Sequence, residues 1–395
     1  MSRLPAPVAW DRAKKILCVR LDALGDVLMT TPAIRALKES LPGRRITLLT
    51  SRGGAAVGGM VPEIDEVMTY DAPWVKATAG RADSRGDHEM VPRLRACEFD
   101  AAVVFTVYSQ NPLPAALLCY LSDIPLRLAH CRENPYQLLT TWVPDPEPQK
   151  RVRHEVRRQL DLVAAVGAVT RNERLSLRVA PHAVSRARRL LDDEGVDPDG
   201  RFVVVHAGAS APSRRYPPES FAVVARQLVT LGGCPVVFTG SADERELVER
   251  IRGEMGEPSV SLVGMLSLPE MAGLLALAPL LVSNNTGPVH MAAAVGTPVV
   301  DLYALTNPQH APWQVPSRVL FEDVPCRYCY KSVCPEGHQQ CLRGVSPERV
   351  VRAALDLLDG AWGRVPSEEA DALPGLAVPG VVLPQPQAPA PGGQA

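Results

Sequence analysis

Residues 20–37, with the sequence RLDALGDVLMTTPAIRAL, decide the fold of this chain. The stretch KKILCVR, which leads into them, predicts a strand, LDALGD predicts a turn, and TTPAIRALKES predicts a helix that opens at Thr31 and Pro32, in the favoured order of cap and proline. Strand, turn and helix form the first unit of an open α/β sheet, which binds ligands at the carboxyl ends of its strands. Gly25 and Asp26 lie in that turn, so Asp26 is either favourable charge near a helix start or a functional carboxylate.

The rest of the chain repeats this alternation of strand and helix, which predicts parallel sheets covered by helices. KILCVR, RITLLT and AAVVFT are the clearest strands of the first half, and RFVVVHAG, PVVFTG, PLLVSN and PVVDLY are those of the second. We therefore predict an α/β fold with two similar halves, residues 1–168 and 169–360, and a cleft between them, which is a preferred place for a ligand.

Three segments look irregular. PDPEPQK resembles a linker ahead of the helix HEVRRQLDLVAAVG, and APWVKATAGRADSRGDHEM is predicted to be a mobile surface excursion. Residues 361–395 are rich in proline, alanine and glycine, a composition that predicts a disordered tail.

Composition narrows the classes of function. The chain has 42 basic and 43 acidic side chains among 395 residues, so its net charge gives no sign of a nucleic-acid partner. It contains no apolar run of about 18 residues, the length that predicts a membrane span. Its start, MSRLPAPVAWDRAKK, lacks the apolar core of a secretory signal. These features predict a cytoplasmic protein of enzyme size.

The nine cysteines fall into two groups. The scattered ones stand in apolar settings and are predicted to be buried free thiols; they are Cys18, Cys97, Cys119, Cys131 and Cys234. The others follow the spacing C-x2-C-x4-C-x6-C within residues 324–345, with His338 among them; they are Cys326, Cys329, Cys334 and Cys341. In a reducing cytosol this cluster favours a structural zinc site with four ligands. Free thiols, a disulfide and an iron–sulfur cluster are the alternatives.

The strongest phrase of the second half is VSNNTGPVHMAAAVG. Asn285, Thr286 and Gly287 form a small polar turn between a strand and a helix, and His290 lies in the first turn of that helix. Backbone N–H groups, a hydroxyl and the positive helix end meet there, an arrangement by which proteins hold phosphate. The alternative is a capped helix with a hydrogen-bonded histidine.

A second loop, HAGASAPSRRYPPESF, also follows a predicted strand. Its small residues include Gly208 and Ser210, and Arg214 and Arg215 come just before the next helix. Guanidinium groups suit phosphate because they stay charged and bind it in a fork. The alternative is that these arginines only hydrate a surface loop.

A third loop, FTGSADERE, places Asp243 and Glu244 after a strand. Either acid can bind a ribose hydroxyl, or it can simply add favourable charge to a helix start. Asp26 faces these loops from the first half. The pattern predicts a diphosphate ligand that the second half binds, with a carboxylate opposite it.

Three phrases, in this order, resemble a known family: ILCVRLDALGDVLMTTPAIRALKESLP, VVVHAGASAPSRRYPPESFAVVARQL and LVSNNTGPVHMAAAVGTPVVDLYALTNPQHAPW. Over residues 14–357 the chain resembles glycosyltransferase family 9, the heptosyltransferase-type enzymes that build the inner core of bacterial lipopolysaccharide. The resemblance implies the GT-B fold, two Rossmann-like doubly wound domains facing each other across a cleft. Residues 1–168 would then be the acceptor domain, and residues 169–360 the nucleotide-sugar domain with the cysteine-rich segment.

The resemblance also implies roles for single residues. Asp26 matches the aspartate of the family's GD pair, the general base that acts on the acceptor hydroxyl. Asn285 is expected to bind the donor, and it stands where the best-known lipopolysaccharide heptosyltransferases have aspartate, a change that affects which donor sugar the pocket accepts. Gly25, Gly208 and Ser210 belong to the turns of the site. The positions that match the family's contacts to the donor are Arg214, Arg215, Asp243, Thr286, Gly287 and His290.

We therefore expect an inverting, metal-independent glycosyltransferase that needs no cofactor for catalysis. The expected reaction moves a sugar, heptose from ADP-heptose, onto a lipopolysaccharide core or a related cell-surface glycan. A nucleotide-sugar epimerase of the same architecture and a non-catalytic nucleotide-sugar-binding protein are the alternatives.

Two basic clusters complete the pattern. They are Arg151, Arg153, Arg157 and Arg158, and Arg186, Arg188 and Arg189. We expect solvated helix faces. The alternative is that one cluster docks an acidic glycolipid acceptor, which would bring the protein to the inner face of the cytoplasmic membrane.

Overall fold

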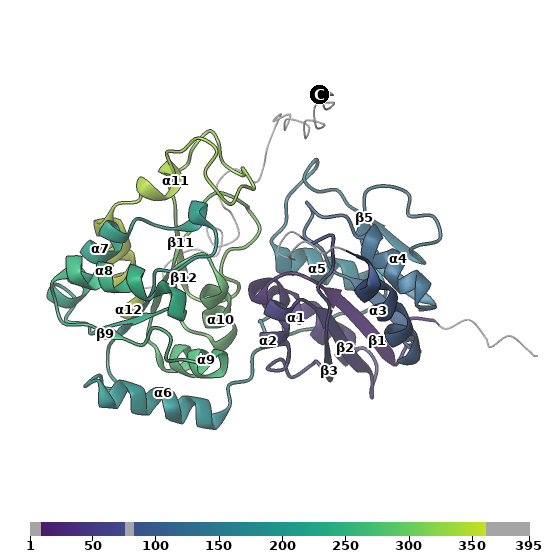
Figure 1. The fold of residues 1–395 in the computed structure, drawn as a ribbon, viewed down its shortest axis with the longest axis horizontal. Coiled ribbons are helices and arrows are strands. Elements are labelled where there is room, and N and C mark those ends of the chain that lie inside the picture. Colours follow the sequence, from purple (N-terminus) through teal and green to yellow (C-terminus); the bar gives the residue numbers. More distant parts are fainter. Residues whose placement is uncertain (1–8, 76–82, 361–395) are drawn as a thin grey trace, which may run out of the picture.

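The computed structural model describes residues 9–75 and 83–360. These residues form two lobes, each built around a six-stranded sheet (Figure 1). The predictions for the tail, and for residues 76–82 of the surface excursion, lie outside the described residues. Residues 85–90 of the same excursion belong to a helix, so that part of the excursion is regular structure.

The first sheet has the strand order β3-β2-β1-β4-β5-β6, with every neighbouring pair parallel. Its strands are β1 Lys15–Arg20, β2 Arg45–Thr50, β3 Glu66–Thr69, β4 Ala101–Val104, β5 Leu126–Cys131 and β6 Thr141–Pro144. Its helices are α1 Leu24–Glu39, α2 Arg52–Gly58, α3 Arg85–Ala96, α4 Leu113–Leu121 and α5 Glu155–Ala164. Helices α1 and α5 pack on one face of the sheet, and α3 and α4 on the other. Central strands can therefore be apolar throughout.

The second sheet has the order β12-β11-β10-β7-β8-β9, again with every neighbouring pair parallel. Its strands are β7 Val203–His206, β8 Val236–Thr239, β9 Val260–Ser261, β10 Leu281–Asn284, β11 Val299–Leu302 and β12 Ser317–Leu320. Its α-helices are α6 Pro181–Asp193, α7 Pro218–Thr230, α8 Arg245–Met255, α9 Leu268–Leu277, α10 Gly287–Val295, α11 Gln340–Arg343 and α12 Pro347–Leu358. The short 3-10 helices are η1 Pro212–Arg214 and η2 Ala242–Glu244.

Counted from its own first strand, each sheet has the same order. The first strand lies inside the sheet. The next two strands are added on one side of it and the last three on the other, and doubly wound sheets bind ligands at the point where the side changes. The predicted α/β fold class is confirmed. The linker-like segment PDPEPQK runs from β6 to α5, so it lies inside the first lobe.

Helix α1 begins at Leu24, about two turns before its predicted start, and Asp26 lies in its first turn. The backbone N–H of the residue before the helix donates to Asp26 Oδ2 at 3.2 Å, which stabilises the earlier start. Pro32 therefore lies inside the helix, where it cannot donate to the carbonyl of Leu28. The hydroxyl of Thr31 donates to that carbonyl instead, at 2.7 Å. The predicted helix start was wrong because this local replacement lets the helix continue through proline.

The two lobes share one apolar core. It joins Val27 and Leu28 of α1 to Val289 and Met291 of α10, each at most 1% exposed. Helices α1 and α10 also contact each other directly. This packing fixes the starts of the two helices relative to one another, and the candidate site lies at those starts.

Candidate active site

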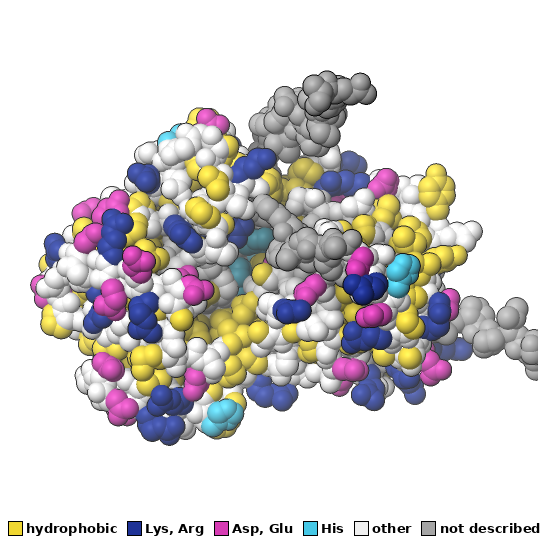
Figure 2. Space-filling view, viewed as in Figure 1, with side chains coloured by type: hydrophobic (Ala, Val, Ile, Leu, Met, Phe, Trp, Pro, Cys, Tyr) yellow, Lys and Arg dark blue, Asp and Glu magenta, His cyan; other side chains and the backbone are white. Residues whose placement is uncertain are grey.

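The starts of α1 and α10 face each other across the boundary between the lobes. A Cβ atom at Gly25 would lie 2.6 Å from Cδ2 of His290, and one at Gly287 would lie 3.2 Å from the side chain of Leu24. Glycine at residue 25 therefore lets the imidazole of the second lobe pack on the backbone of the first. Figure 2 shows the surface hollowed between the lobes, with histidine side chains in the hollow.

Asp26 is held from two sides. Its Oδ1 accepts a hydrogen bond from Arg20 Nη2 at 2.9 Å, and its Oδ2 accepts one from the backbone N–H of Ala23. Burial alone would raise the pKa of Asp26, but the positive charge of Arg20, with smaller effects from His310 and His290, brings that pKa below its usual value. Asp26 is thus an ionised carboxylate at neutral pH.

Two histidines of the second lobe lie near Asp26, the buried His290 and the half-buried His310. Burial lowers the pKa of His290 to about 3 and that of His310 to about 4, so both rings are neutral at pH 7. His290 Nδ1 and His310 Nε2 have no hydrogen-bond partner among the described residues. Neutral rings with an unused nitrogen can donate to or accept from a ligand without bringing charge of their own.

The polar turn before α10 is built on neutral hydrogen bonds. The side chain of Asn284 accepts the backbone N–H of Tyr216 at 2.9 Å and donates to the carbonyl of Ala207 at 2.8 Å. Thr286 is the N-cap of α10, and its hydroxyl donates to the carbonyl of Asn284 at 3.2 Å. The first turn of α10 contains no acidic residue, so the positive end of this helix is available to an anion.

Asn285 points away from such an anion. Its Nδ2 donates to Asp301 Oδ2 at 2.8 Å and to the carbonyl of His310 at 2.9 Å. Burial raises the pKa of Asp301 to about 8, so this carboxyl is protonated at neutral pH. The structure thus brings a carboxyl group from β11 next to the position where the sequence has asparagine instead of aspartate.

The two arginines of the second loop differ. Arg214 ends η1 and is half-buried, and its charge contributes to lowering the pKa of both His290 and His310. Arg215 is exposed, and its Nε donates to the carbonyl of Ala209 at 2.8 Å, within its own loop. The structure therefore brings Arg214 to the predicted site, and it directs Arg215 to the loop backbone.

The third loop favours a different acid from the one predicted. Glu244 packs against Gly208, where a Cβ atom would lie 1.9 Å from its Oε1, and its Oε2 accepts the backbone N–H of Ser241 at 2.8 Å. Asp243 and Ser210 are exposed. Glu244, rather than Asp243, is the acid at the edge where β7 and β8 end.

The cysteine-rich segment forms a small cavity of about 20 Å3 beside η1, and its four cysteines and His338 line that cavity. The thiols are free, and Cys326 Sγ lies 3.8 Å from His338 Nε2. Among residues 9–75 and 83–360, no three or more His, Cys, Asp or Glu side chains are placed to hold a metal ion. Of the scattered cysteines, Cys97 is half-buried rather than buried.

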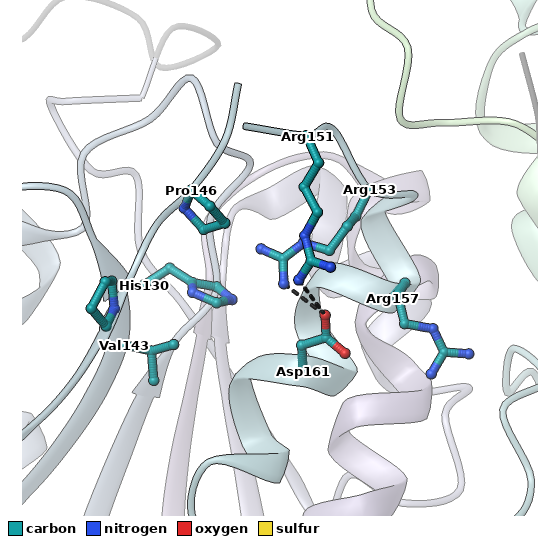
Figure 3. Close-up of a pocket in the computed structure, with 8 residues that line it drawn as sticks. His130, Val143, Pro146, Arg151, Arg153, Arg157 and Asp161 are labelled. Carbon is teal, nitrogen blue, oxygen red and sulfur yellow. Dashed lines mark hydrogen bonds and ion pairs between the residues drawn. The ribbon is translucent and has the colours of Figure 1, made fainter. Parts of the chain in front are cut away.

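The first basic cluster lines a cavity of about 500 Å3 at the edge of β5 and β6 (Figure 3). The side chains of Arg151 and Arg153 both form ion pairs with Asp161, and that of Arg157 points away from Asp161. Arg158 is 1% exposed and binds two buried acids, Asp145 and Glu147.

The solvated helix face predicted for this cluster was therefore wrong for Arg153 and Arg158, which are 9% and 1% exposed. Both are enclosed in ion pairs that neutralise them. In the second cluster, Arg188 forms an exposed pair with Asp199, 2.7 Å apart.

Sequence reasoning missed four residues near Asp26 and the α10 turn: Arg20, Glu155, Asp301 and His310. Only His310 carried a signal, as part of the phrase TNPQHAPW that follows β11. Glu155 pairs with Arg20, 135 residues away along the chain, and Asp301 pairs with Asn285, 16 residues away, whereas Arg20 is six residues from Asp26.

Comparisons with solved structures identify the fold. The glycosyl transferase family 9 protein of Veillonella parvula matches with a TM-score of 0.75 at 24% identity, covering 89% of this chain and 98% of that one. The ADP-heptose lipopolysaccharide heptosyltransferase II of Escherichia coli matches with a TM-score of 0.67 at 23% identity, covering 88% and 99%. The two lobes therefore form the GT-B architecture of glycosyltransferases.

The sequence comparisons give the family. The model of glycosyltransferase family 9 (heptosyltransferase) matches residues 88–340. The chain is 26% identical to lipopolysaccharide heptosyltransferase 3 of Escherichia coli over 298 residues, 73% of this chain and 83% of that protein. It is 25% identical to lipopolysaccharide heptosyltransferase 1 of Pseudomonas aeruginosa over 323 residues, 81% and 87%. The chain belongs to glycosyltransferase family 9, and it is a glycosyltransferase.

Proposed function

We propose that this protein transfers heptose from ADP-heptose to a sugar hydroxyl of a lipopolysaccharide core. One observation carries the proposal. The ionised carboxylate of Asp26, on α1, lies close to the start of α10, a helix end that has no acidic residue in its first turn and can bind an anion. The names of the relatives support the donor and the acceptor, because each acts on lipopolysaccharide. One solved relative, the Escherichia coli heptosyltransferase WaaC, was obtained with ADP-2-deoxy-2-fluoro heptose.

In the proposed reaction Asp26 is the general base. As the acceptor oxygen forms a bond to the anomeric carbon, its proton passes to Asp26, and the bond from that carbon to the diphosphate oxygen breaks. ADP leaves with the electron pair. A single displacement of this kind inverts the anomeric centre, and a positioned base contributes roughly 100 to 10,000-fold to its rate.

The second lobe would stabilise the negative charge that grows on ADP. The N–H groups at the start of α10, the neutral ring of His290 and the guanidinium of Arg214 are proposed as its contacts. Because arginine stays charged and forks onto phosphate, these groups can do the work that a metal ion does in other transferases. We propose that catalysis needs no metal.

The test is a binding and transfer experiment with a panel of ADP, UDP, GDP and dTDP sugars. A ligand at about 100 times its Kd stabilises the folded state by roughly 2.7 kcal/mol, so the panel is read by thermal shift. Product is then sought by mass spectrometry with lipopolysaccharide that lacks core heptose. Stabilisation and transfer with ADP-heptose alone are expected.

The other outcomes have distinct meanings. A response to a different nucleotide sugar overturns the donor. Conversion of the sugar without an acceptor identifies an epimerase, and no response to any member of the panel identifies a protein without this activity.

The proposed location is the cytoplasm, with the acceptor glycolipid met at the inner face of the membrane. Across the described ranges, no helix combines the length and apolar character needed to cross a membrane. We propose that the contact is peripheral. Co-sedimentation with vesicles that contain the acceptor, compared with vesicles of neutral lipid, tests it; equal recovery from both contradicts the contact.

We also propose that the cysteine-rich segment binds a structural zinc ion. Gln340 donates its backbone N–H to His338 Nδ1 at 2.9 Å, so the proton of the neutral ring is on Nε2, beside Cys326 Sγ. His338 is then a hydrogen-bond donor to a thiolate, and four cysteines are left as ligands. Rotation of the thiols into the cavity that they line is the movement required.

Metal analysis of protein purified under reducing conditions tests the zinc site. About one zinc ion per chain is expected, and it should be lost in Cys329→Ser but kept in Cys97→Ser, which lies outside the segment. A metal content near zero in the unaltered protein discards the proposal without affecting the proposed reaction.

A further inference from the structure

The guanidinium of Arg20 lies behind Asp26 and is fully buried. It is surrounded by three carboxylates: Arg20 Nη2 is 2.9 Å from Asp26 Oδ1, Nη1 is 2.6 Å from Glu155 Oε1, and Nε is 3.0 Å from Asp22 Oδ2. The side chain of Glu155 is also fully buried, whereas Asp26 and Asp22 remain 20% and 16% exposed. The cluster therefore has an enclosed rear, Arg20 and Glu155, and a front of two aspartates that solvent reaches.

Glu155 is anchored independently of Asp26. It begins α5, its backbone N–H donates to the carbonyl of Gln309 at 3.0 Å, and the side chain of Gln159 donates to its Oε1 at 2.7 Å. A buried charge persists only when it is paired and hydrogen-bonded. Glu155 thus fixes one arm of the Arg20 guanidinium, and the rigid fork fixes the direction of the other arm.

We infer that Arg20 is a positioning residue for catalysis, held by Glu155, that orients the Asp26 carboxylate and keeps it ionised. The inference rests on the proposed role of Asp26 as general base. Arg20 does not itself exchange protons, because a guanidinium stays charged. Because its guanidinium is enclosed, Arg20 acts through the carboxylates that it holds, and of these Asp26 is the proposed base.

The groups around the cluster set the expected direction of any pH effect. Arg20 and Asp22 of the first lobe, and His290 and His310 of the second, face Asp26. Arg214 faces the two histidines, and Glu155 faces Arg20. Of these, Arg20 is the largest influence that lowers the pKa of Asp26. The electrostatic surroundings of Asp26 are therefore set by six side chains: Arg20, Asp22, Glu155, Arg214, His290 and His310.

The experiment compares Arg20→Lys and Glu155→Gln with the unaltered protein, using ADP-heptose and lipopolysaccharide that lacks core heptose. In Arg20→Lys the fork is lost, so kcat should fall about tenfold or more while the Kd for ADP-heptose stays within about twofold. The acid limb of the kcat–pH profile should move to higher pH, because burial then raises the pKa of Asp26 with less opposition. In Glu155→Gln one negative charge disappears, so kcat should fall less and the acid limb should move to lower pH.

Arg35→Lys is the matched control, because Arg35 is also on the first lobe and binds a carboxylate, that of Glu63, at 2.8 Å. It should alter thermal stability without moving the pH profile. An unchanged kcat and acid limb in both Arg20→Lys and Glu155→Gln would overturn the inference. If Arg20→Lys does not fold, Glu155→Gln decides alone. Full activity of Asp26→Asn would instead remove the proposed function itself, so the two failures are distinguishable.

Discussion

The two lobes repeat one topology, yet the helix starts that meet between them carry opposite electrostatics. Helix α1 has a carboxylate, Asp26, in its first turn, and a buried ion cluster holds that carboxylate in place. Helix α10 has no acid in its first turn, and the turn before it is fixed by neutral hydrogen bonds from Asn284 and Thr286. The same fold element thus presents a carboxylate on one side and an unneutralised positive helix end on the other.

The difference in charge between the two helix starts suits them to different parts of the proposed reaction, one to the acceptor and one to the donor. A helix start that already holds a carboxylate does not attract a phosphate, whereas one with free N–H groups does. In the proposed reaction, the charge at each start, and not the topology, places the base in the first lobe and the donor phosphates in the second. Exchanging or cancelling these charges should therefore abolish function while leaving the fold intact.

The largest effect is expected from Asp26→Asn, which removes the base and keeps the shape. Transfer should fall by roughly 100 to 10,000-fold, while the Kd for ADP-heptose stays nearly unchanged because the donor is bound by the other lobe. Measurement of kcat and of donor binding on the same preparation checks both parts. Retention of full transfer would show that Asp26 is not the base.

Thr286→Asp should make the α10 start resemble the α1 start. Aspartate is as good a helix cap as threonine, so the fold should persist, but the carboxylate would neutralise the helix end and repel phosphate. The Kd for ADP-heptose should rise about tenfold or more, since one charge repulsion of about 1.4 kcal/mol suffices for that. Isothermal titration measures it.

Thr286→Asn is the control for the same position, because asparagine has the shape of aspartate without its charge. Its donor affinity should stay close to that of the unaltered protein. Equal weakening in both variants would mean that shape, and not charge, governs this turn.

Gly25→Ala breaks the contact between the two starts. The added methyl would lie 2.6 Å from Cδ2 of His290, so either the ring or the lobe boundary must shift, at a cost of about 1–3 kcal/mol. Both unfolding free energy and kcat should fall. Gly53→Ala in α2 is the control, because the nearest atom to its new methyl is Ser51 Oγ at 3.7 Å; similar losses in both variants would rule out the proposed close contact.

Much of the fold could be predicted from sequence because the central strands are apolar throughout. KILCVR, RITLLT, VVVH and LVSN are strands that helices cover on both faces, and they are recognisable by composition. Two of the missed strands are short or half-exposed, TWVP at one sheet edge and the two-residue β9, and a third, the buried β5 LRLAHC, is interrupted by arginine and histidine. In these strands the apolar pattern is too brief or too diluted to identify.

The candidate site also has a part that could be predicted from the sequence and a part that could not. Asp26 and the turn before α10 are local phrases, so the sequence contains both the residue and its setting. Arg20 is only six residues from Asp26, but the acid that holds Arg20 is not local: Glu155 lies 135 residues after Arg20 along the chain, and the packing of α5 on α1 brings them together. The inward orientation of the Asn285 side chain could not be predicted from the sequence either, because it depends on a hydrogen bond to Asp301 on the neighbouring strand.

The smallest effect is a pH dependence of stability that arises behind the α10 turn. Burial raises the pKa of Asp301 to about 8, against about 3.9 in an unfolded chain. The folded state therefore holds a proton that the unfolded state releases, so this group contributes its full stability below about pH 4 and loses it as the pH rises toward 8. The loss is at most about 1.4 kcal/mol for each pH unit in that window.

Asp301→Asn should cancel this dependence, since its amide can accept the same hydrogen bond from Asn285 and does not ionise. The difference in unfolding free energy between Asp301→Asn and the unaltered protein should grow in favour of the variant between pH 6 and pH 7. Urea unfolding at the two pH values measures that difference, and all other titrating groups cancel in it. A constant difference would mean that Asp301 is already ionised in the folded protein. The hydrogen bonds behind the α10 turn would then include a charged carboxylate and would not all be neutral.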